Sequence, residues 1–157
     1  MISKRASVAS LVLSAAALVG IALKEGYSDR AIIPVPGDVP TIGFGTTDGV
    51  KMGDRTTPPQ ALARKLSDVQ KYEGAIRDCV GAPLYQHEYD AYVSLAYNIG
   101  PNAFCDSTLV RLLNQERYEE ACRQILRWDK FKGQPLKGLT ARRQSEFSQC
   151  MGEGARP

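Results

Sequence analysis

The sequence has little of what metal and cofactor sites need. It contains one histidine, His87, among 157 residues, and none of its four cysteines is spaced as C-x-x-C. Structural zinc sites are built from closely spaced cysteine and histidine ligands. We therefore expect no metal site and no cofactor.

Cysteine is absent from the first 78 residues. The four that follow, Cys79, Cys105, Cys122 and Cys150, form an even set, which in an exported chain favours two disulfides. Three pairings are possible, and their spacing does not choose among them. In a cytosolic chain the same residues would instead serve as small buried apolar side chains.

A strong excess of one charge is also missing. Lys and Arg number 20 and Asp and Glu number 17, so the formal net charge is +3. No basic run stands out, and nucleic-acid binding usually needs a clustered basic surface. The length suits one domain, and we expect a monomer that does not bind nucleic acid.

The longest uncharged run is residues 6–23, ASVASLVLSAAALVGIAL, which follows Lys4 and Arg5. As a helix these 18 residues would be about 27 Å long, close to the roughly 30 Å of a bilayer's hydrocarbon core. Small polar or flexible residues oppose its apolar ones: Ser7, Ser10, Ser14 and Gly20. The preference of this segment for lipid should therefore be marginal.

Three interpretations of this start compete. A cleaved signal peptide fits the basic residues and the small residues that follow, but cleavage after Ala16, Ala17 or Ala22 would remove most of the first helix. A permanent anchor needs a more apolar segment. We favour an uncleaved segment that first lodges in the membrane, with the N-terminus inside, and later packs as the first helix of the soluble domain.

The rest of the chain predicts an α+β fold in which helix dominates. Residues 27–46 combine prolines and glycines with β-branched residues, which is typical of a small β-ribbon. Helical periodicity then predicts helices over residues 57–79, 86–99, 118–128 and 140–151, with a further helix capped by Ser107 or Thr108. The expected order is one long N-terminal helix, a ribbon and an all-helical lobe.

Glu25 lies where the apolar segment ends and the ribbon begins. Cleavage of a glycosidic bond needs an acid whose proton survives near neutral pH, and this favours a partly desolvated carboxyl group. Glu25 is our candidate for that acid. An ordinary glutamate at a helix end is the alternative.

Several segments together resemble the phage-type lysozymes, glycoside hydrolase family 24. E-G at residues 25–26 and PTIGFGT at 40–46 look like the family's catalytic ribbon. Residues 89–114, 119–128 and 137–147 look like its helical lobe, so the resemblance extends over about residues 15–150. It implies a lysozyme-like fold, in which an N-terminal helix and a small β-ribbon pack on a mostly helical lobe.

The start of the chain resembles the signal-arrest-release segment of some phage endolysins. The resemblance implies that residues 1–24 are a weakly hydrophobic membrane segment that becomes the first helix, and that residues 25–157 are the catalytic domain. It also implies export by the host machinery, a transient tether in the host inner membrane, and release into the periplasm when a holin, acting indirectly, abolishes the membrane potential.

The family pattern has an Asp nine residues after the Glu and a Thr six residues later, and here the Asp is missing. Its position falls on Pro34 counted from Glu25, or on Val35 counted back from Thr41. Asp38, three residues before Thr41, is our first candidate to replace it, and Asp29 is the second. A Gly-Asp pair is also ordinary turn chemistry, so Asp38 could be structural.

The remaining candidate site residues also follow from the resemblance. Thr41 would orient the nucleophilic water, and Asn98 would face the substrate. Arg142 and Arg143 would either hold Glu25 in place or bind peptide-stem carboxylates of the substrate. Each has a plain structural alternative: a strand residue, a helix cap, or a solvated basic turn. Gly43 and Gly45 would let the saccharide or a facing helix approach the backbone closely.

The preferred function is that of a phage endolysin that hydrolyses the β-1,4 bond between N-acetylmuramic acid and N-acetylglucosamine in peptidoglycan. Two alternatives stay open at this point. A lytic transglycosylase on the same fold needs a single carboxyl group, which suits the missing Asp. A non-catalytic peptidoglycan-binding protein needs none.

Overall fold

The computed structural model describes residues 4–153, which form two compact units. One unit is formed by residues 15–71, and the other by residues 4–14 together with residues 72–153. The boundary falls inside the long helix α2 (Pro58–Cys79).

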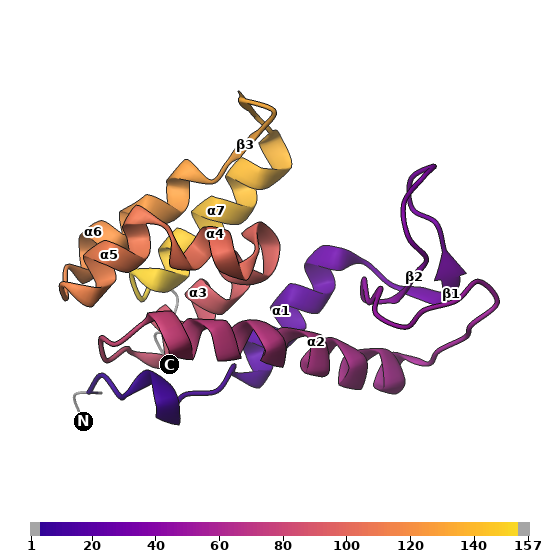
Figure 1. The fold of residues 1–157 in the computed structure, drawn as a ribbon, viewed down its shortest axis with the longest axis horizontal. Helices are drawn as coiled ribbons and strands as arrows, with labels where there is room; N and C mark the ends of the chain where they lie inside the picture. The colour runs from indigo at the N-terminus through magenta and orange to yellow at the C-terminus, as the bar shows by residue number, and fades with distance from the viewer. Residues whose placement is uncertain (1–3, 154–157) are drawn as a thin grey trace. The chain divides into compact units, whose positions relative to one another are not determined.

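The 15–71 unit contains helix α1 (Ala15–Glu25), strands β1 (Ser28–Ile32) and β2 (Thr41–Gly43), and the first part of α2 (Figure 1). The strands are antiparallel and pair Ser28 with Gly43 and Ile32 with Thr41, with a bulge between the two pairs. This confirms the ribbon predicted over residues 27–46. Three prolines occur in the loop between the strands, where no ladder hydrogen bond is required: Pro34, Pro36 and Pro40.

Helix α2 starts as the sequence predicts. The Thr57 backbone N–H donates to the Gln60 side chain over 3.2 Å, and the Ala61 N–H donates to the Thr57 carbonyl over 2.8 Å. Prolines at the first two helical positions cost no hydrogen bond, because the N–H groups there have no partner within the helix.

The predicted single helix over residues 6–23 is wrong. Only a 3₁₀ turn (Val8–Ser10) and helix α1, which begins at Ala15, are helical. Ala6 exchanges two backbone hydrogen bonds of 2.8 Å with Leu84, and the N–H groups of Leu13 and Ser14 donate to carboxylates of other helices. These external partners replace the bonds that a continuous helix would make.

Within residues 4–153, none of the helices has both the length and the apolar character that crossing a membrane requires.

The second unit is helical and is built around α3 (Gln86–Ile99). Every residue of α3 from Glu88 to Ala96 is buried, which is typical of a helix surrounded by others. Its neighbours in contact are α4 (Pro101–Cys105) and α7 (Lys137–Cys150), and α5 (Thr108–Asn114) packs on α6 (Tyr118–Gln124). Figure 1 shows α5, α6 and α7 grouped near α3.

The predicted helix boundaries hold closely in this unit. Helix α3 has the predicted bounds, and the Ser107 hydroxyl caps α5 by accepting the Val110 N–H. The helix predicted over residues 118–128 is shorter and ends in a 3₁₀ turn (Ile125–Arg127), whereas α7 begins three residues earlier than expected. Helix α4 and a hairpin of β3 (Lys130–Phe131) and β4 (Gln134–Pro135) were not predicted.

Two disulfides tie helices together, as expected for an exported chain. Cys79 at the end of α2 is bonded to Cys105 of α4, and Cys122 of α6 is bonded to Cys150 of α7. This selects one of the three pairings that the sequence left open.

Candidate active site

The G-F-G motif forms a tight turn at the end of β2. Ile42 and Thr46 exchange two backbone hydrogen bonds, of 2.9 and 3.0 Å, and enclose Gly43, Phe44 and Gly45. Both glycines have positive φ, +63° and +85°, which side chains rarely allow. The motif therefore closes a turn that other residues would strain.

Gly43 lies against helix α2. A Cβ on this residue would stand 2.7 Å from the Cβ of Ala61, which is closer than two carbon atoms can approach without movement. The turn can pack on α2 only because Gly43 has no side chain. The facing-helix role expected for this glycine is confirmed.

Gly45 lies against Glu25. A Cβ on Gly45 would stand 3.4 Å from both the Cβ and the Oε2 of Glu25, and 3.6 Å from the Nζ of Lys65. The carboxylate of Glu25 and the ammonium group of Lys65 therefore border the same point of the ribbon turn. Lys65, on α2, is completely buried.

Glu25 is the last residue of α1 and is exposed. The partly desolvated setting expected from the sequence is thus not seen. The ribbon turn nevertheless lies directly beside the carboxylate, as the resemblance implies.

Two side-chain bonds hold the ribbon on α2. The buried Thr46 donates its hydroxyl hydrogen to Asp68 over 2.7 Å. Lys71 bonds Asp48 over 2.7 Å on the surface, and this hydrogen bond lowers the pKa of Asp48. The first of these is shielded from water, so it contributes more to fixing the turn than the exposed pair does.

Asp38 and Thr41 each form a hydrogen bond with Val39, which lies between them in the ribbon. The Asp38 N–H donates to the Val35 carbonyl over 2.9 Å, which closes a turn with Pro36 and Gly37 at its corner. The exposed Asp38 carboxylate accepts the Val39 N–H over 2.8 Å. The hydroxyl of the half-buried Thr41 donates to the Val39 carbonyl over 3.2 Å.

Asp29 lies on β1, where its carboxylate is 60% exposed and 3.4 Å from the Arg30 guanidinium. Glu25, Asp29, Asp38 and Thr41 thus all belong to the 15–71 unit. Phe44, in the middle of the G-F-G turn, also helps to line an apolar cavity of about 410 Å³ with residues of α1 and α2.

The other three candidates, Asn98, Arg142 and Arg143, lie in the helical unit. Asn98 is exposed near the end of α3. Arg143 is 1% exposed and its guanidinium lies 2.7 Å from a Glu146 oxygen, while Arg142 donates to the same carboxylate over 3.3 Å.

Glu146 is the centre of this arginine cluster. It is completely buried, and it also accepts the Ser94 hydroxyl hydrogen over 2.6 Å. Burial lowers the pKa of Arg143, and Glu146 opposes that shift. Sequence reasoning missed Glu146, although its spacing of three and four residues from the two arginines places all three on one face of a helix.

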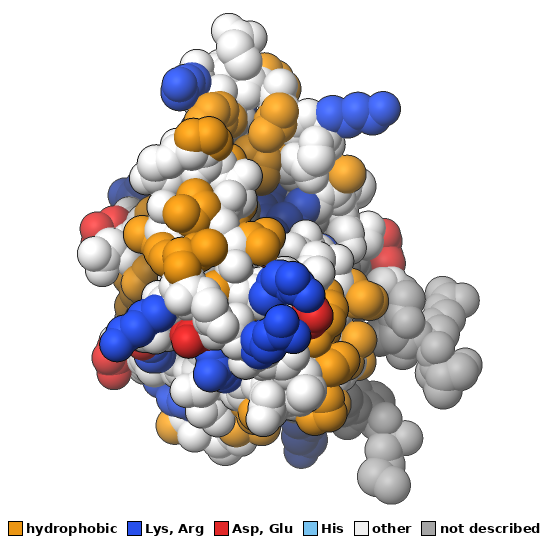
Figure 2. Space-filling model, turned by 90° about the vertical axis from the view of Figure 1, so that its right-hand side faces the viewer, with side chains coloured by type: hydrophobic (Ala, Val, Ile, Leu, Met, Phe, Trp, Pro, Cys, Tyr) orange, Lys and Arg blue, Asp and Glu red, His pale blue; other side chains and the backbone are white. Residues whose placement is uncertain are grey.

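The charged surface of the molecule is mixed. On the face shown in Figure 2, Lys and Arg side chains are scattered among hydrophobic and uncharged ones. Among residues 4–153, no three His, Cys, Asp or Glu side chains are grouped so that they could hold a metal ion.

Comparison with known proteins identifies the family. The family model described as phage lysozyme matches residues 22–146, which include Glu25 and the G-F-G turn. This chain belongs to the phage lysozyme family. Membership makes it a glycoside hydrolase with the fold expected from the sequence.

Individual proteins also match over most of the chain. The SAR-endolysin of Pseudomonas phage phiKMV is 40% identical over 141 residues, which cover 87% of each chain. The structure of the endolysin from Escherichia coli O157:H7 phage FAHEc1 has a TM-score of 0.80 and 34% identity, and covers 90% of this chain and 94% of that one. The muramidase domain of SpmX from Asticaccaulis excentricus has a TM-score of 0.81 and 33% identity, with 89% and 97% coverage.

Proposed function

We propose that this phage lysozyme is an endolysin that lyses the host by hydrolysing the β-1,4 bond between N-acetylmuramic acid and N-acetylglucosamine in peptidoglycan. The observation that carries the proposal is the contact of Gly45 with Glu25, which sets a carboxyl group beside the ribbon turn. The SpmX domain, which shares the fold at 33% identity, is a muramidase by name. Its name supports hydrolysis of the same bond by this chain.

In this mechanism Glu25 donates a proton to the leaving oxygen of the glycosidic bond. Thr41 accepts or donates a hydrogen bond to the attacking water, which meets the developing oxocarbenium centre from the other side. The Thr41 hydroxyl now bonds the Val39 carbonyl, so it can still accept a hydrogen bond from that water.

The second carboxylate, which takes the proton that the attacking water loses, is assigned to Asp38, ahead of Asp29. Asp38 is exposed and its carboxylate is engaged by one backbone N–H, which leaves acceptor capacity for a water. Asp29 is instead beside the cation of Arg30.

Substrate binding is assigned to Asn98, Arg142 and Arg143 with different roles. Asn98 offers an exposed amide that can bind a sugar hydroxyl or N-acetyl group. Both arginines bond the buried Glu146. Arg142, 12% exposed, is the one that can meet a substrate carboxylate, whereas the buried Arg143 acts by holding Glu146.

We also propose that residues 1–24 hold the enzyme in the host inner membrane before release into the periplasm. The phiKMV relative is named a SAR-endolysin, and the marginal apolar run over residues 6–23 suits a segment that can leave lipid. The two disulfides need an oxidising compartment, which supports export. The observed α1 uses only the second half of the run, from Ala15.

The membrane potential gives this release a physical control. Lys4 and Arg5 start on the cytoplasmic side and must move outward for the segment to leave. Moving each positive charge against an inside-negative potential costs about 2.3 kcal/mol per 100 mV. When a holin dissipates the potential, that cost disappears.

Digestion of purified peptidoglycan tests the chemistry. Mass spectrometry of the products should show reducing N-acetylmuramic acid ends from the unaltered enzyme and no digestion by Glu25→Gln, which should still pellet with peptidoglycan. Products with 1,6-anhydromuramic ends would show a transglycosylase instead. Unchanged digestion by Glu25→Gln would refute the role given to Glu25.

A further inference from the structure

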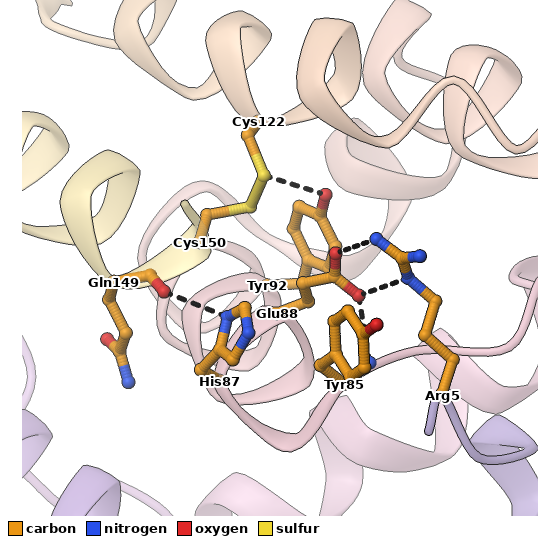
Figure 3. Close-up of a disulfide and its surroundings, with 8 residues drawn as sticks. All are labelled: Arg5, Tyr85, His87, Glu88, Tyr92, Cys122, Gln149 and Cys150. Carbon is orange, nitrogen blue, oxygen red and sulfur yellow. Dashed lines mark hydrogen bonds and ion pairs between the residues drawn. A yellow bond between two sulfur atoms is a disulfide. The ribbon is translucent and has the colours of Figure 1, made fainter. Parts of the chain in front are cut away.

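Arg5 occupies a site made by three residues of the helical unit, Tyr85, Glu88 and Tyr118, called here the Arg5 site. The guanidinium lies 4.3 Å from the centre of the Tyr85 ring and 3.5 Å from that of Tyr118. Its Nη2 donates to Glu88 Oε1 over 2.8 Å, and its Nε donates to Oε2 over 3.1 Å. Figure 3 shows Arg5 facing Glu88 beside Tyr85.

The Arg5 site has a buried carboxylate and partly exposed aromatic sides. Glu88, on α3, is 3% exposed and also accepts the Tyr85 N–H over 2.8 Å. Tyr118 is the first residue of α6, which the Cys122–Cys150 disulfide binds to α7 (Figure 3). A flat guanidinium suits two ring faces and a forked carboxylate, whereas a lysine ammonium could not make both hydrogen bonds in this geometry.

The residues that follow Arg5 are held by further buried carboxylates. The Leu13 N–H donates to Glu73 over 2.7 Å, and Ser14 donates its N–H and its hydroxyl hydrogen to Asp90 over 3.0 and 2.6 Å. Glu73 and Asp90 are 3% and 5% exposed. Residues 5–14 are thus fastened to the helical unit at both ends, and Ser14 directly precedes α1.

We propose that the Arg5 site is a receptor for the chain's own N-terminal arginine, which it captures after release and which it lacks while the segment lies in the membrane. This regulatory role rests on the proposed function. The binding itself does not.

The charges explain why the capture matters. In the membrane-held form Arg5 lies on the cytoplasmic side of the apolar run, separated by the bilayer from Glu88. Glu88 then keeps one of its three hydrogen bonds, that from Tyr85, and its burial without a cation is unfavourable. Capture of Arg5 satisfies both groups and makes return of the segment to lipid costly.

Lys4 provides a matched control. It has the same charge, adjoins Arg5 in sequence and is exposed. Arg5→Ala and Lys4→Ala therefore change the charge of the N-terminus, and its response to the membrane potential, equally. Only the first removes the guanidinium from the Arg5 site.

Hydrogen exchange of the purified full-length protein tests the proposal. In Arg5→Ala, the amide of Ala6, which bonds Leu84, should exchange at least about tenfold faster than in the unaltered protein, because two charge-assisted hydrogen bonds are lost next to it. In Lys4→Ala its exchange should be unchanged. Equal protection of Ala6 in Arg5→Ala and the unaltered protein would overturn the proposal.

The aromatic ring of Tyr118 allows a second test with two variants, one of which is conservative. Tyr118→Phe keeps the ring face and should keep the protection of Ala6, whereas Tyr118→Leu should lose it. If Ala6 lost its protection in both Tyr118 variants, or in neither, the cation–π contact would not be part of the receptor. Peptidoglycan digestion by the same samples is measured separately, so a protein with an intact Arg5 site but no digestion would refute the proposed function and leave the receptor standing.

Discussion

The Oε2 atom of Glu25 lies 3.4 Å from the point where a Cβ on Gly45 would stand. The Glu25 carboxylate, at the end of α1, therefore lies beside the space that Gly45 of the ribbon turn leaves open. Two separate effects of a side chain at residue 45 are expected, backbone strain from the φ of +85° and contact of the added Cβ with the Glu25 carboxylate. The two effects can be separated by mutation.

Gly45→Ala should lower peptidoglycan digestion by about tenfold, because a methyl group would touch the Glu25 carboxylate and restrict its positions. Gly49 is the matched control, since its φ is +69° and no atom lies within 4 Å of its added Cβ. Both variants should lose about 1–2 kcal/mol of stability from backbone strain. Equal loss of activity in the two variants would mean that strain alone, and not Glu25, explains the effect.

Asp38→Asn should lower the turnover number by about 10²-fold, in the range of general base catalysis, if Asp38 replaces the family Asp. Asp29→Asn should leave it nearly unchanged, because Asp29 is exposed beside Arg30. Steady-state kinetics on purified peptidoglycan distinguish the two. A large loss of turnover in Asp29→Asn with little loss in Asp38→Asn would assign the role to Asp29. Full activity in both variants would indicate a site with a single essential acid.

Gly20→Leu should delay lysis of host cells. The substitution makes the membrane segment more apolar by about 1 kcal/mol and so disfavours release. The structure leaves open space around Gly20, with no atom within 4 Å of an added Cβ, so the folded enzyme should accept the change. Purified Gly20→Leu should therefore digest peptidoglycan normally, and lysis on the usual schedule would contradict membrane control.

Reduction of the disulfides should destabilise the helical unit. The bonded cysteines are 26 and 28 residues apart, for which loop-closure entropy gives about 3.5 kcal/mol for each bond. Urea unfolding of Cys79→Ser and Cys122→Ser variants should show a loss of that size in each. A loss near zero in both would show that neither bond restrains the unfolded chain.

Much of the fold could be predicted because its signals are local. The capping residues Thr57 and Ser107 and the apolar spacing of α3 fix helix starts and faces within a few residues of sequence. The β3–β4 hairpin was missed because its strands have two residues each. Lys132 and Gly133, both at positive φ, form its turn in place of the usual Asn-Gly.

The N-terminal segment could not be predicted from its own residues. Its apolar spacing allows a helix from residue 6 to residue 23. Its backbone instead bonds to Leu84, Glu73 and Asp90, which lie 60 to 78 positions away along the chain. Such partners carry no local signal. The same applies to Glu146, whose burial beside Arg143 emerges only from the packing of α7.

The position of Glu25 beside Gly45 could also not be predicted from the sequence. The motif suggested that a saccharide or a helix approaches the glycines, and only the structure shows that α2 meets Gly43 and Glu25 meets Gly45. The burial of Lys65 at the same point gave no signal either, because a lysine on a helix is usually exposed.

The N-terminal segment must stay in the chain for both the release from the membrane and the capture of Arg5, since it contains Arg5 and most of α1. N-terminal sequencing of active enzyme recovered from lysed cells tests this directly. We predict a sequence that begins at Met1 or Ile2. Active enzyme that begins after Ala16, Ala17 or Ala22 would contradict both the release from the membrane and the capture of Arg5.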